Sequence, residues 1–498
     1  MIAFLAAVAA AVSPAPAPAS PITERDLRRH IEILASDEYE GRKPGTEGGN
    51  KTALYIATEL QRAGLRPGAS SASWYEMVAL AERALAAQRN RWWMEAKGRS
   101  AARPLSVAEG DIILAGRDPS IAIADAPVVF VGHGLQIEGV RDDLAGVDLK
   151  GAIVLILPGR PDPMASVPSY NARRADLARR GAAAVLAVAG PRAPWEEMRA
   201  ALAAPKIELV SADRAAVEGA IARPAIEALV RAAGLDLATI EDAARLPGFR
   251  AMRLGRASLD VTASVRRLDS PNVIGRIAGT DPAKGAVVYL AHWDHLGVCR
   301  PEGAADRICN GAVDNASGVA VMIEVARRMA RGPKPVRDVY FVATTAEENG
   351  LLGARAFVAS PPVPLAGIVG AINIDTVAIA PRTDMVAVIG KGMTPLDPLI
   401  EKVVGEAGRK LVPDDAVNEL VQRQDGWVLM ERGVSAVMVG GAYADPIPLA
   451  GFLGGPYHKP EDDLEREIVL DGAAQDGDLM LALGRALADP ARYTPPAK

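Results

Sequence analysis

The chain has 498 residues, so more than one folding unit is expected. Its hydrophobic fraction of 49% and charged fraction of 23% are typical of a soluble globular protein. A net charge of −5 and an aromatic fraction of 4% argue against a nucleic-acid surface, which needs basic residues and stacking rings.

The N-terminus has the composition of an export signal. Ile2 to Val12 is an unbroken apolar run, too short to cross a bilayer, which takes about 20 residues. Ala17-Pro18-Ala19 then offers a small-residue cleavage site. The first basic residue is Arg25, so the usual positive start is missing, and a disordered leader or a mis-assigned start codon is the alternative. We predict a signal peptide over residues 1–19, a periplasmic or secreted protein, and no membrane span in the mature chain.

Two amphipathic helices are predicted after this leader, over residues 24–36 and 50–64. Asn50 is a typical N-cap for the second helix, and Gly64 is a typical end. A loop dense in glycine and charge separates them.

A β-rich module is predicted over residues 115–262, where short apolar runs are closed by Gly or Pro. Residues 223–245 within it are predicted to form one helix. The module's single histidine, His133, lies between two glycines and has no acidic neighbour in sequence. We therefore assign it no role, because ligand histidines normally need such partners.

From residue 270 onward, apolar strand runs alternate with helices. This alternation predicts an α/β fold: a mixed, largely parallel sheet covered by helices on both faces. The main domain is then expected to combine residues 20–114 with residues 263–490, and the β-rich module is inserted between them. The strand runs are 272–279, 286–294, 336–348 and 367–377, and the helices are about 316–331, 395–409 and 466–488.

Five separated polar residues follow or bound these apolar runs. Metal sites in such sheets are assembled from single ligands at several strand ends, since ligands bind at the carboxyl edge of the sheet. Two imidazoles and three carboxylates suit a pair of divalent cations, with zinc as the expected metal. The predicted ligands are His292, Asp314, Glu348, Asp375 and His458.

Two of these residues also have an ordinary structural interpretation. Asp314 precedes a helix start and would serve there as a cap, and His458 lies in a Gly/Pro-rich loop that favours a solvated histidine. Asp375 differs, because a bare carboxylate in the apolar string INIDTV would cost several kcal/mol without a cation. The metal prediction therefore depends on the five residues taken together.

Two further carboxylates are candidates for roles beside the metal. Glu347 adjoins Glu348 after a buried strand, so one can bind metal while the other accepts a proton from water; a solvated loop pair is the alternative. Asp294 lies two positions after His292, so in an extended strand both side chains point the same way. Asp294 can then accept the other ring N–H of His292, either directly or from the second shell around the metal. By the same alternation His295 faces the other way, and we assign it no role.

Tyr457, beside His458, can hydrogen-bond a developing oxyanion. Rival catalytic motifs are missing from the sequence: it has no G-x-S-x-G, H-E-x-x-H or C-x-x-C string and no phosphate-binding loop.

The two cysteines, Cys299 and Cys309, lie ten positions apart between two predicted ligands. In an exported protein they are expected to form a disulfide beside the metal site. Metal ligation and two free thiols are the alternatives.

Read in order, the strings HWDHLG, GAVDNASG, AEENGLLGA, INIDTV and YHKPEDD resemble the co-catalytic di-zinc aminopeptidase family, which also holds glutamate carboxypeptidase II and the transferrin receptor. Residues 35–66 resemble that family's N-terminal segment, and the module at 115–262 resembles its inserted protease-associated domain. One departure is Arg423-Gln424-Asp425-Gly426, where the family usually has serine–aspartate–histidine.

The resemblance implies a role for each site residue. His292 and Asp375 would hold one zinc ion, Glu348 and His458 would hold the other, and Asp314 would bridge them. Glu347 matches the general base, Asp294 the carboxylate behind the first histidine, and Tyr457 a tyrosine that polarises the scissile carbonyl in some members.

The predicted function is hydrolysis of the N-terminal peptide bond of peptides by an exported di-zinc aminopeptidase. Carboxypeptidase or amidohydrolase action at the same metals is an alternative that a basic pocket for a substrate carboxylate would favour, and Arg423 is the nearest sequence hint. A non-catalytic binding protein is a further alternative, although all five ligands and the base are present.

Overall fold

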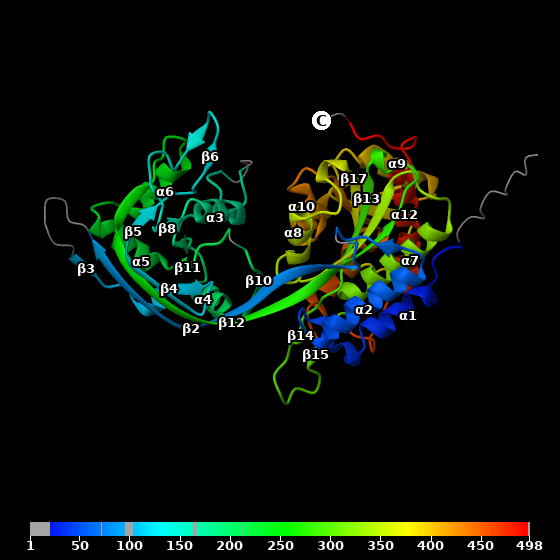
Figure 1. The fold of residues 1–498 in the computed structure, drawn as a ribbon, viewed down its shortest axis with the longest axis horizontal. Helices are drawn as coiled ribbons and strands as arrows, with labels where there is room; N and C mark the ends of the chain where they lie inside the picture. The colour runs from blue at the N-terminus through cyan, green and yellow to red at the C-terminus, as the bar shows by residue number, and fades with distance from the viewer. Residues whose placement is uncertain (1–19, 71, 95–102, 163–166, 212, 497–498) are drawn as a thin grey trace, which may run out of the picture. The chain divides into compact units, whose positions relative to one another are not determined.

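The computed structural model describes residues 20–70, 72–94, 103–162, 167–211 and 213–496, so the predicted signal peptide at 1–19 lies outside the described residues. The chain divides into two compact units (Figure 1). The first unit combines Met1–Val78 with Asp269–Lys498, and the second is Ala79–Leu268. The predicted module at 115–262 falls inside the second unit, and its likeness to a protease-associated domain stays a prediction.

The first unit contains a mixed, largely parallel sheet, as predicted. Its strands follow the order β19-β18-β20-β17-β13-β16-β12, and the four central strands β20, β17, β13 and β16 are parallel to their neighbours within this group. The pairs β12–β16 and β18–β20 are antiparallel. The bounds are β12 Met252–Ile277, β13 Ala286–His292, β16 Asp338–Thr344, β17 Ile368–Asn373, β18 Met385–Ile389, β19 Lys410–Leu411 and β20 Ala436–Gly440.

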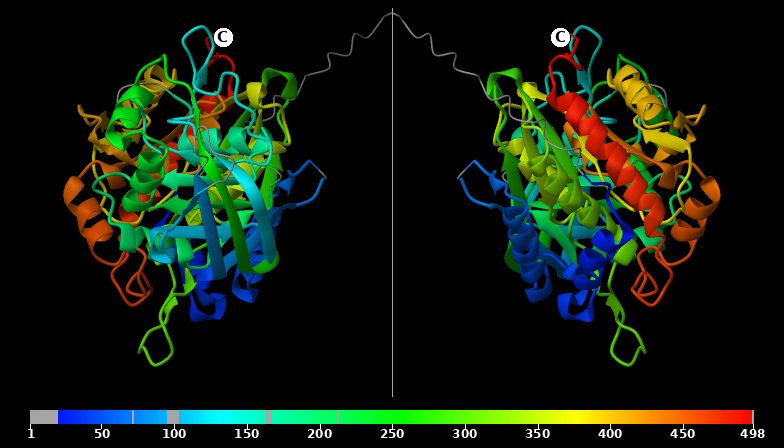
Figure 2. Two further views of the ribbon diagram at one scale, coloured as in Figure 1. Left: turned by 90° about the vertical axis from the view of Figure 1, so that its left-hand side faces the viewer. Right: turned by 90° about the vertical axis from the view of Figure 1, so that its right-hand side faces the viewer.

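Helices cover both faces of this sheet because successive side chains of a strand point to opposite sides. Tyr289 of β13 packs into one apolar cluster with α1, α2, α7, α9 and α12, whereas Leu290 packs into another with α8 and α10. Figure 2 shows α12 in red beside the other helices of its face. The bounds are α1 Glu24–Leu34, α2 Glu47–Arg62, α7 Gly318–Arg331, α8 Leu352–Ala359, α9 Asp397–Glu406, α10 Gly426–Met430, α11 Pro446–Gly454 and α12 Leu470–Ala488.

In the second unit the strands follow the order β12-β5-β8-β9-β11-β4, and the unit has its own apolar core. The long strand β2 pairs with β3 and β10. The bounds are β2 Tyr75–Met94, β3 Arg103–Leu105, β4 Ile112–Gly116, β5 Ser120–Phe130, β6 Gln136–Ile137, β7 Arg141–Asp142, β8 Ile153–Ile156, β9 Ala184–Val188, β10 Lys206–Leu209, β11 Val217–Ile221, α3 Tyr170–Arg179, α4 Trp195–Ala203, α5 Arg223–Ala232 and α6 Leu237–Arg245.

Two predicted element boundaries are wrong. Helix α2 begins at Glu47, and its cap is Thr46, whose side chain accepts a hydrogen bond from the Gly49 N–H, so Asn50 lies inside the helix. The single helix expected over 223–245 is two helices, because Gly234 turns the chain with φ of +78°. Among the described residues, no helix combines the length and the apolar character needed to span a bilayer.

Candidate metal centre

The sheet of the first unit positions most of the predicted site residues at one edge. His292 is the last residue of β13, Asp375 follows the end of β17, and Glu347 and Glu348 follow the end of β16. Because β13, β16 and β17 are parallel, their carboxyl ends meet there. Asp314 lies on the turn before α7, and this completes the shared edge.

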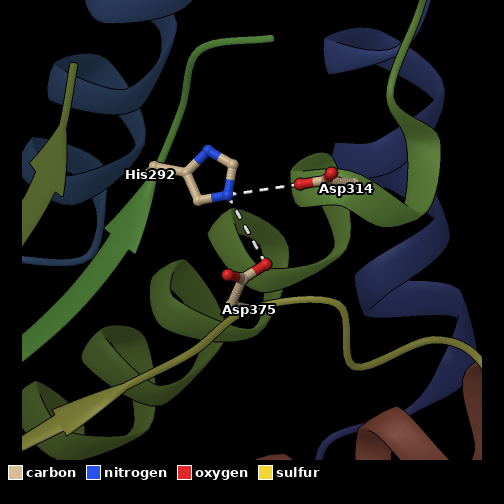
Figure 3. Close-up of side chains that lie close together, drawn as sticks. All are labelled: His292, Asp314 and Asp375. Atoms are coloured by element: carbon tan, nitrogen blue, oxygen red, sulfur yellow. Dashed lines mark ion pairs between the residues drawn. The ribbon is translucent and has the colours of Figure 1, made fainter. Parts of the chain in front are cut away.

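The first group of donors consists of His292, Asp314 and Asp375 (Figure 3). The Nε2 atom of His292 lies 3.3 Å from Asp314 Oδ1 and 3.4 Å from Asp375 Oδ1. These distances match the spacing of about 3.3–3.4 Å that tetrahedral geometry gives for ligand atoms about 2.0–2.1 Å from zinc. All three side chains are largely buried, so the group suits a shared cation better than a set of hydrogen bonds to water.

The second group lies around the other oxygen of Asp314. His458 Nε2 is 3.4 Å from Asp314 Oδ2 and 2.9 Å from Glu348 Oε2. The carboxylate of Asp314 therefore has one oxygen toward each group, which is the arrangement that a bridging ligand requires. The structure brings all five predicted ligands together.

His295 also belongs to this centre, although the sequence analysis assigned it no role. Its ring is buried, and a 2.7 Å hydrogen bond joins Nδ1 to Glu348 Oε1. Together with Asp314 and Glu348 it forms a second possible metal-binding group. The prediction failed because β13 ends at His292, so the alternation of a strand does not extend to residue 295. The second histidine of AHWDH was the available signal.

Asp294 is placed differently from the expectation. The Nδ1 atom of His292 lies 3.9 Å from Asp294 Oδ1 and 3.2 Å from the backbone oxygen of Asp294. The hydrogen-bond partner of the ring is therefore the backbone oxygen rather than the carboxylate. The same Oδ1 accepts the backbone N–H of Glu347 at 3.0 Å, so Asp294 fixes the segment that carries Glu347. Burial raises the pKa of Asp294 to about 7, although the nearby His292 ring opposes the shift.

The two adjacent glutamates have opposite electrostatic environments. Burial raises the pKa of Glu347 well above its usual value, and neighbouring carboxylates including Asp425 add to the shift. Burial and Asp314 would also raise the pKa of Glu348, but hydrogen bonds with His295 and His458 lower it. When two neighbouring carboxyl groups have pKa values shifted in opposite directions, the one with the lowered pKa stays charged and the one with the raised pKa can carry a proton. Here Glu348 is the first and Glu347 the second.

The histidines respond to the surrounding carboxylates. Burial alone would lower the pKa of His292, but the nearby acids raise it well above the ordinary value. Burial opposes the shift of His458 as well, and hydrogen bonds with Asp314 and Glu348 raise its pKa to about 9. In the metal-free protein, bound protons thus supply the positive charge that these acids attract.

Two buried residues that the sequence analysis missed hold the ligand-carrying loops. Arg42 donates hydrogen bonds to the backbone oxygens of Leu34, Trp293, Asn310 and Gly311 at 2.5–2.8 Å. Asp462 accepts the backbone N–H groups of Val313 and Asp314, one on each carboxylate oxygen, at 2.9 Å. Both connect segments far apart in sequence, and their neighbours in sequence give no sign of these contacts.

A small pocket opens beside the centre. Asp375 and Tyr457 line it at the metal side, and the ring of Tyr457 stacks on His458 with centroids 3.7 Å apart. Among the described residues that line the pocket, Arg423 is the one with a basic side chain. The apolar part of the lining consists of Ile389, Leu420, Met438, Leu449 and Leu453. A concave, mainly apolar pocket with a few polar groups is typical of a small-molecule or side-chain site.

Three buried polar atoms near the centre have no hydrogen-bond partner among the described residues: Asp294 Oδ2, His295 Nε2 and Asp425 Oδ1. Such atoms are costly unless water or a cation satisfies them. The spacing of the donors and these unsatisfied atoms together fit a divalent metal centre of nitrogen and oxygen ligands.

Comparison with known proteins agrees with this geometry. Residues 272–484, which carry all five predicted ligands, match the model of peptidase family M28. We call residues 272–484, after this match, the M28 domain. The resemblance inferred from the five motifs is confirmed. The match does not extend to the second unit, whose assignment as a protease-associated domain stays a prediction.

The similar curated proteins cover only part of the chain. A protein named Probable lipoprotein aminopeptidase LpqL, from Mycobacterium tuberculosis, is 33% identical over 153 residues, which is 30% of this chain and 28% of its own. A glutamate carboxypeptidase 2 homolog from Caenorhabditis elegans is 28% identical over 225 residues, which is 42% of this chain and 26% of its own. The chain thus spans about a quarter of the length of these relatives. A solved aminopeptidase from Aneurinibacillus sp. strain AM-1 is 20% identical, covers 93% of each chain and has a TM-score of 0.49.

Proposed function

We propose that the protein is an exported aminopeptidase that uses two zinc ions to hydrolyse the N-terminal peptide bond of peptides. The observation that carries the proposal is the placement of Asp314, whose two oxygens face His292 on one side and His458 on the other. His292 and Asp375 would hold one ion, Glu348 and His458 the other, and Asp314 would bridge them. His295 competes with His458 for the second position, since both contact Glu348.

When bound, two zinc ions lower the pKa of water and polarise a carbonyl group. Glu347 would take the proton of the attacking water and return it to the leaving amine, because its raised pKa suits a group that both accepts and donates. The Tyr457 hydroxyl would donate a hydrogen bond to the oxygen of the scissile carbonyl as charge develops on it. The apolar cavity beside Asp375 would receive the side chain of the N-terminal residue.

The roles of base and ligand separate in two variants. Glu347→Gln should retain zinc and lose turnover by about 10²–10⁴-fold, the usual scale for an acid–base group. Asp375→Ala should instead lose zinc, measured by elemental analysis of the purified protein. Full turnover in zinc-loaded Glu347→Gln would remove Glu347 from the proposed chemistry, and an unchanged zinc content in Asp375→Ala would remove that ligand.

A substrate panel tests the reaction class. Chromogenic amides of free amino acids should be cleaved, their N-blocked counterparts should not, and a chelator should abolish the cleavage. Cleavage restricted to peptides with a free C-terminal carboxylate would favour the carboxypeptidase alternative. Arg423, which lines the pocket, is the residue that could bind such a carboxylate. Detection of the mature N-terminus at residue 20 in a cell-envelope fraction would support export.

A further inference from the structure

Arg423 lies against the candidate oxyanion donor Tyr457. It is the last residue of the 3₁₀ segment Ala416–Arg423, and its Nη2 donates a hydrogen bond to Tyr457 Oη at 3.1 Å. The guanidinium carbon lies 5.7 Å from the centroid of the tyrosine ring. Within the described part of the chain Arg423 forms no ion pair, so this contact is its principal polar interaction.

The chemistry of the two groups fixes the direction of this hydrogen bond. A guanidinium has only donors, so Tyr457 Oη must be the acceptor. The hydroxyl carries a single hydrogen of its own, and that hydrogen must then point to another acceptor. Arg423 therefore restricts the one rotation that decides where the hydroxyl donates.

The ring itself has little freedom left. His458 stacks on one face of Tyr457 with centroids 3.7 Å apart, and Phe452 meets the ring edge-on at 5.7 Å. The carboxylates of the metal centre would otherwise compete as acceptors for the hydroxyl hydrogen, since Asp375 lines the same cavity. A fixed ring with a directed hydroxyl is a preorganised donor, and preorganised donors stabilise a developing negative charge.

We propose that Arg423 is a positioning residue for Tyr457: by occupying the acceptor lone pair of Oη, it directs the hydroxyl hydrogen toward the oxygen of the scissile carbonyl. This inference rests on the proposed function, because it needs a peptide bond at the centre.

The rival role for the same side chain is recognition of a substrate carboxylate, which a guanidinium also suits. The two roles differ in what they affect. Positioning acts through Tyr457 and changes kcat for every substrate, whereas carboxylate recognition acts directly and changes KM only for peptides with a free C-terminus.

The test is a double-mutant cycle on the zinc-loaded full chain, with Arg423→Met, Tyr457→Phe and the double variant. Tyr457→Phe should lower kcat by about 10²-fold, the scale of one lost oxyanion donor. Arg423→Met should lower kcat by about tenfold in the native background and have no further effect beside Tyr457→Phe. Arg423→Lys should recover part of the loss, because an ammonium is also only a donor.

Arg432→Met is the matched control, since it removes the same charge from an exposed arginine nine positions along the chain and should leave kcat unchanged. Zinc content and melting temperature, measured for every variant, identify any that fail to fold. Each variant is assayed on a dipeptide and on the corresponding dipeptide amide.

Equal losses from Arg423→Met in both backgrounds would overturn the positioning role. A rise in KM for the dipeptide alone, with kcat unchanged, would overturn it in favour of carboxylate recognition. If the zinc-loaded native protein cleaves neither substrate, the proposed function fails and the inference fails with it. Turnover without coupling between the two residues removes the inference and leaves the proposed function standing.

Discussion

Buried charge at the candidate metal centre is balanced differently from buried charge in the second unit. In the second unit, Asp143 is fully buried and pairs with Arg141 at 2.6 Å, and Glu218 pairs with Arg174 and Arg214. At the candidate metal centre, the buried acids instead surround histidines, and the buried Arg42 donates its hydrogen bonds to backbone oxygens.

This difference separates a self-contained core from a binding site. A buried carboxylate that pairs with an arginine of the same chain has its charge neutralised by folding. The carboxylates around His292 and His458 lack such a partner among the described residues, so their charge has to be balanced by protons or by cations from solution. The predictions below test that contrast.

The largest expected effect is loss of the bridging residue. Asp314→Ala should abolish binding of both ions, because each group of donors loses one member. The zinc affinity should fall by more than the factor of about 10–100 that loss of an outer-shell partner costs. The measurement is the zinc content after dialysis, with Asp306→Ala as the exposed control. If Asp314→Ala keeps two ions per chain, the bridging arrangement is wrong.

The second unit should respond to loss of a buried partner without any effect on zinc. Asp143 accepts hydrogen bonds from Arg141 and from the Leu135 N–H, so Asp143→Ala leaves a buried guanidinium unpaired. Breaking such a pair costs about 3–5 kcal/mol. Hydrogen exchange should rise in peptides from Ala79–Leu268 while the zinc content stays constant. Asp242→Ala, from an exposed pair, is the control and should change exchange little.

The parts of the structure that the sequence predicted are those with local signals. Uninterrupted apolar runs mark buried strands, and a polar residue at the end of such a run stands out. The sheet and the five candidate ligands could therefore be predicted before the structure. The resemblance supplied the assignment of ligands to two ions, which the spacing of residues alone did not give.

The missed residues depend on contacts between distant segments. Arg42 reaches backbone oxygens more than 250 residues away, and Asp462 reaches Asp314 across 148 residues. Their sequence contexts, a charged glycine-rich loop and an acidic run, favour solvated side chains. His295 was assigned no role because the strand was expected to continue past His292, where β13 in fact ends. A sequence pattern reports periodicity within an element, and it does not report which loops meet.

The disulfide should have an intermediate effect, confined to the M28 domain. Cys299 and Cys309 are bonded, as expected, and the bridge closes the loop that precedes Asp314. A closed loop of this length is worth about 2–3 kcal/mol in the chain-entropy estimate. Reduction, or a double replacement by alanine, should lower the melting temperature of the M28 domain and weaken zinc binding. The second unit should keep its exchange pattern under the same reductant, because both cysteines of the chain lie outside it.

The smallest effect is expected from pH, and it distinguishes the two ways of balancing charge. His458 has a raised pKa of about 9 in the metal-free protein, so below that pH its imidazole carries a proton that zinc must displace. The apparent zinc affinity of that position should therefore fall as the pH falls, by up to about tenfold per unit, since one bound proton competes with one ion. Competition with a chelator of known affinity at pH 8.5, 7.5 and 6.5 measures the slope. The hydrogen exchange of the second unit, corrected for the intrinsic pH dependence, should stay constant over the same pH range. A zinc affinity independent of pH would mean that the histidines are already neutral before the metal binds. The contrast between the candidate metal centre and the second unit would then not be one of protons against arginines.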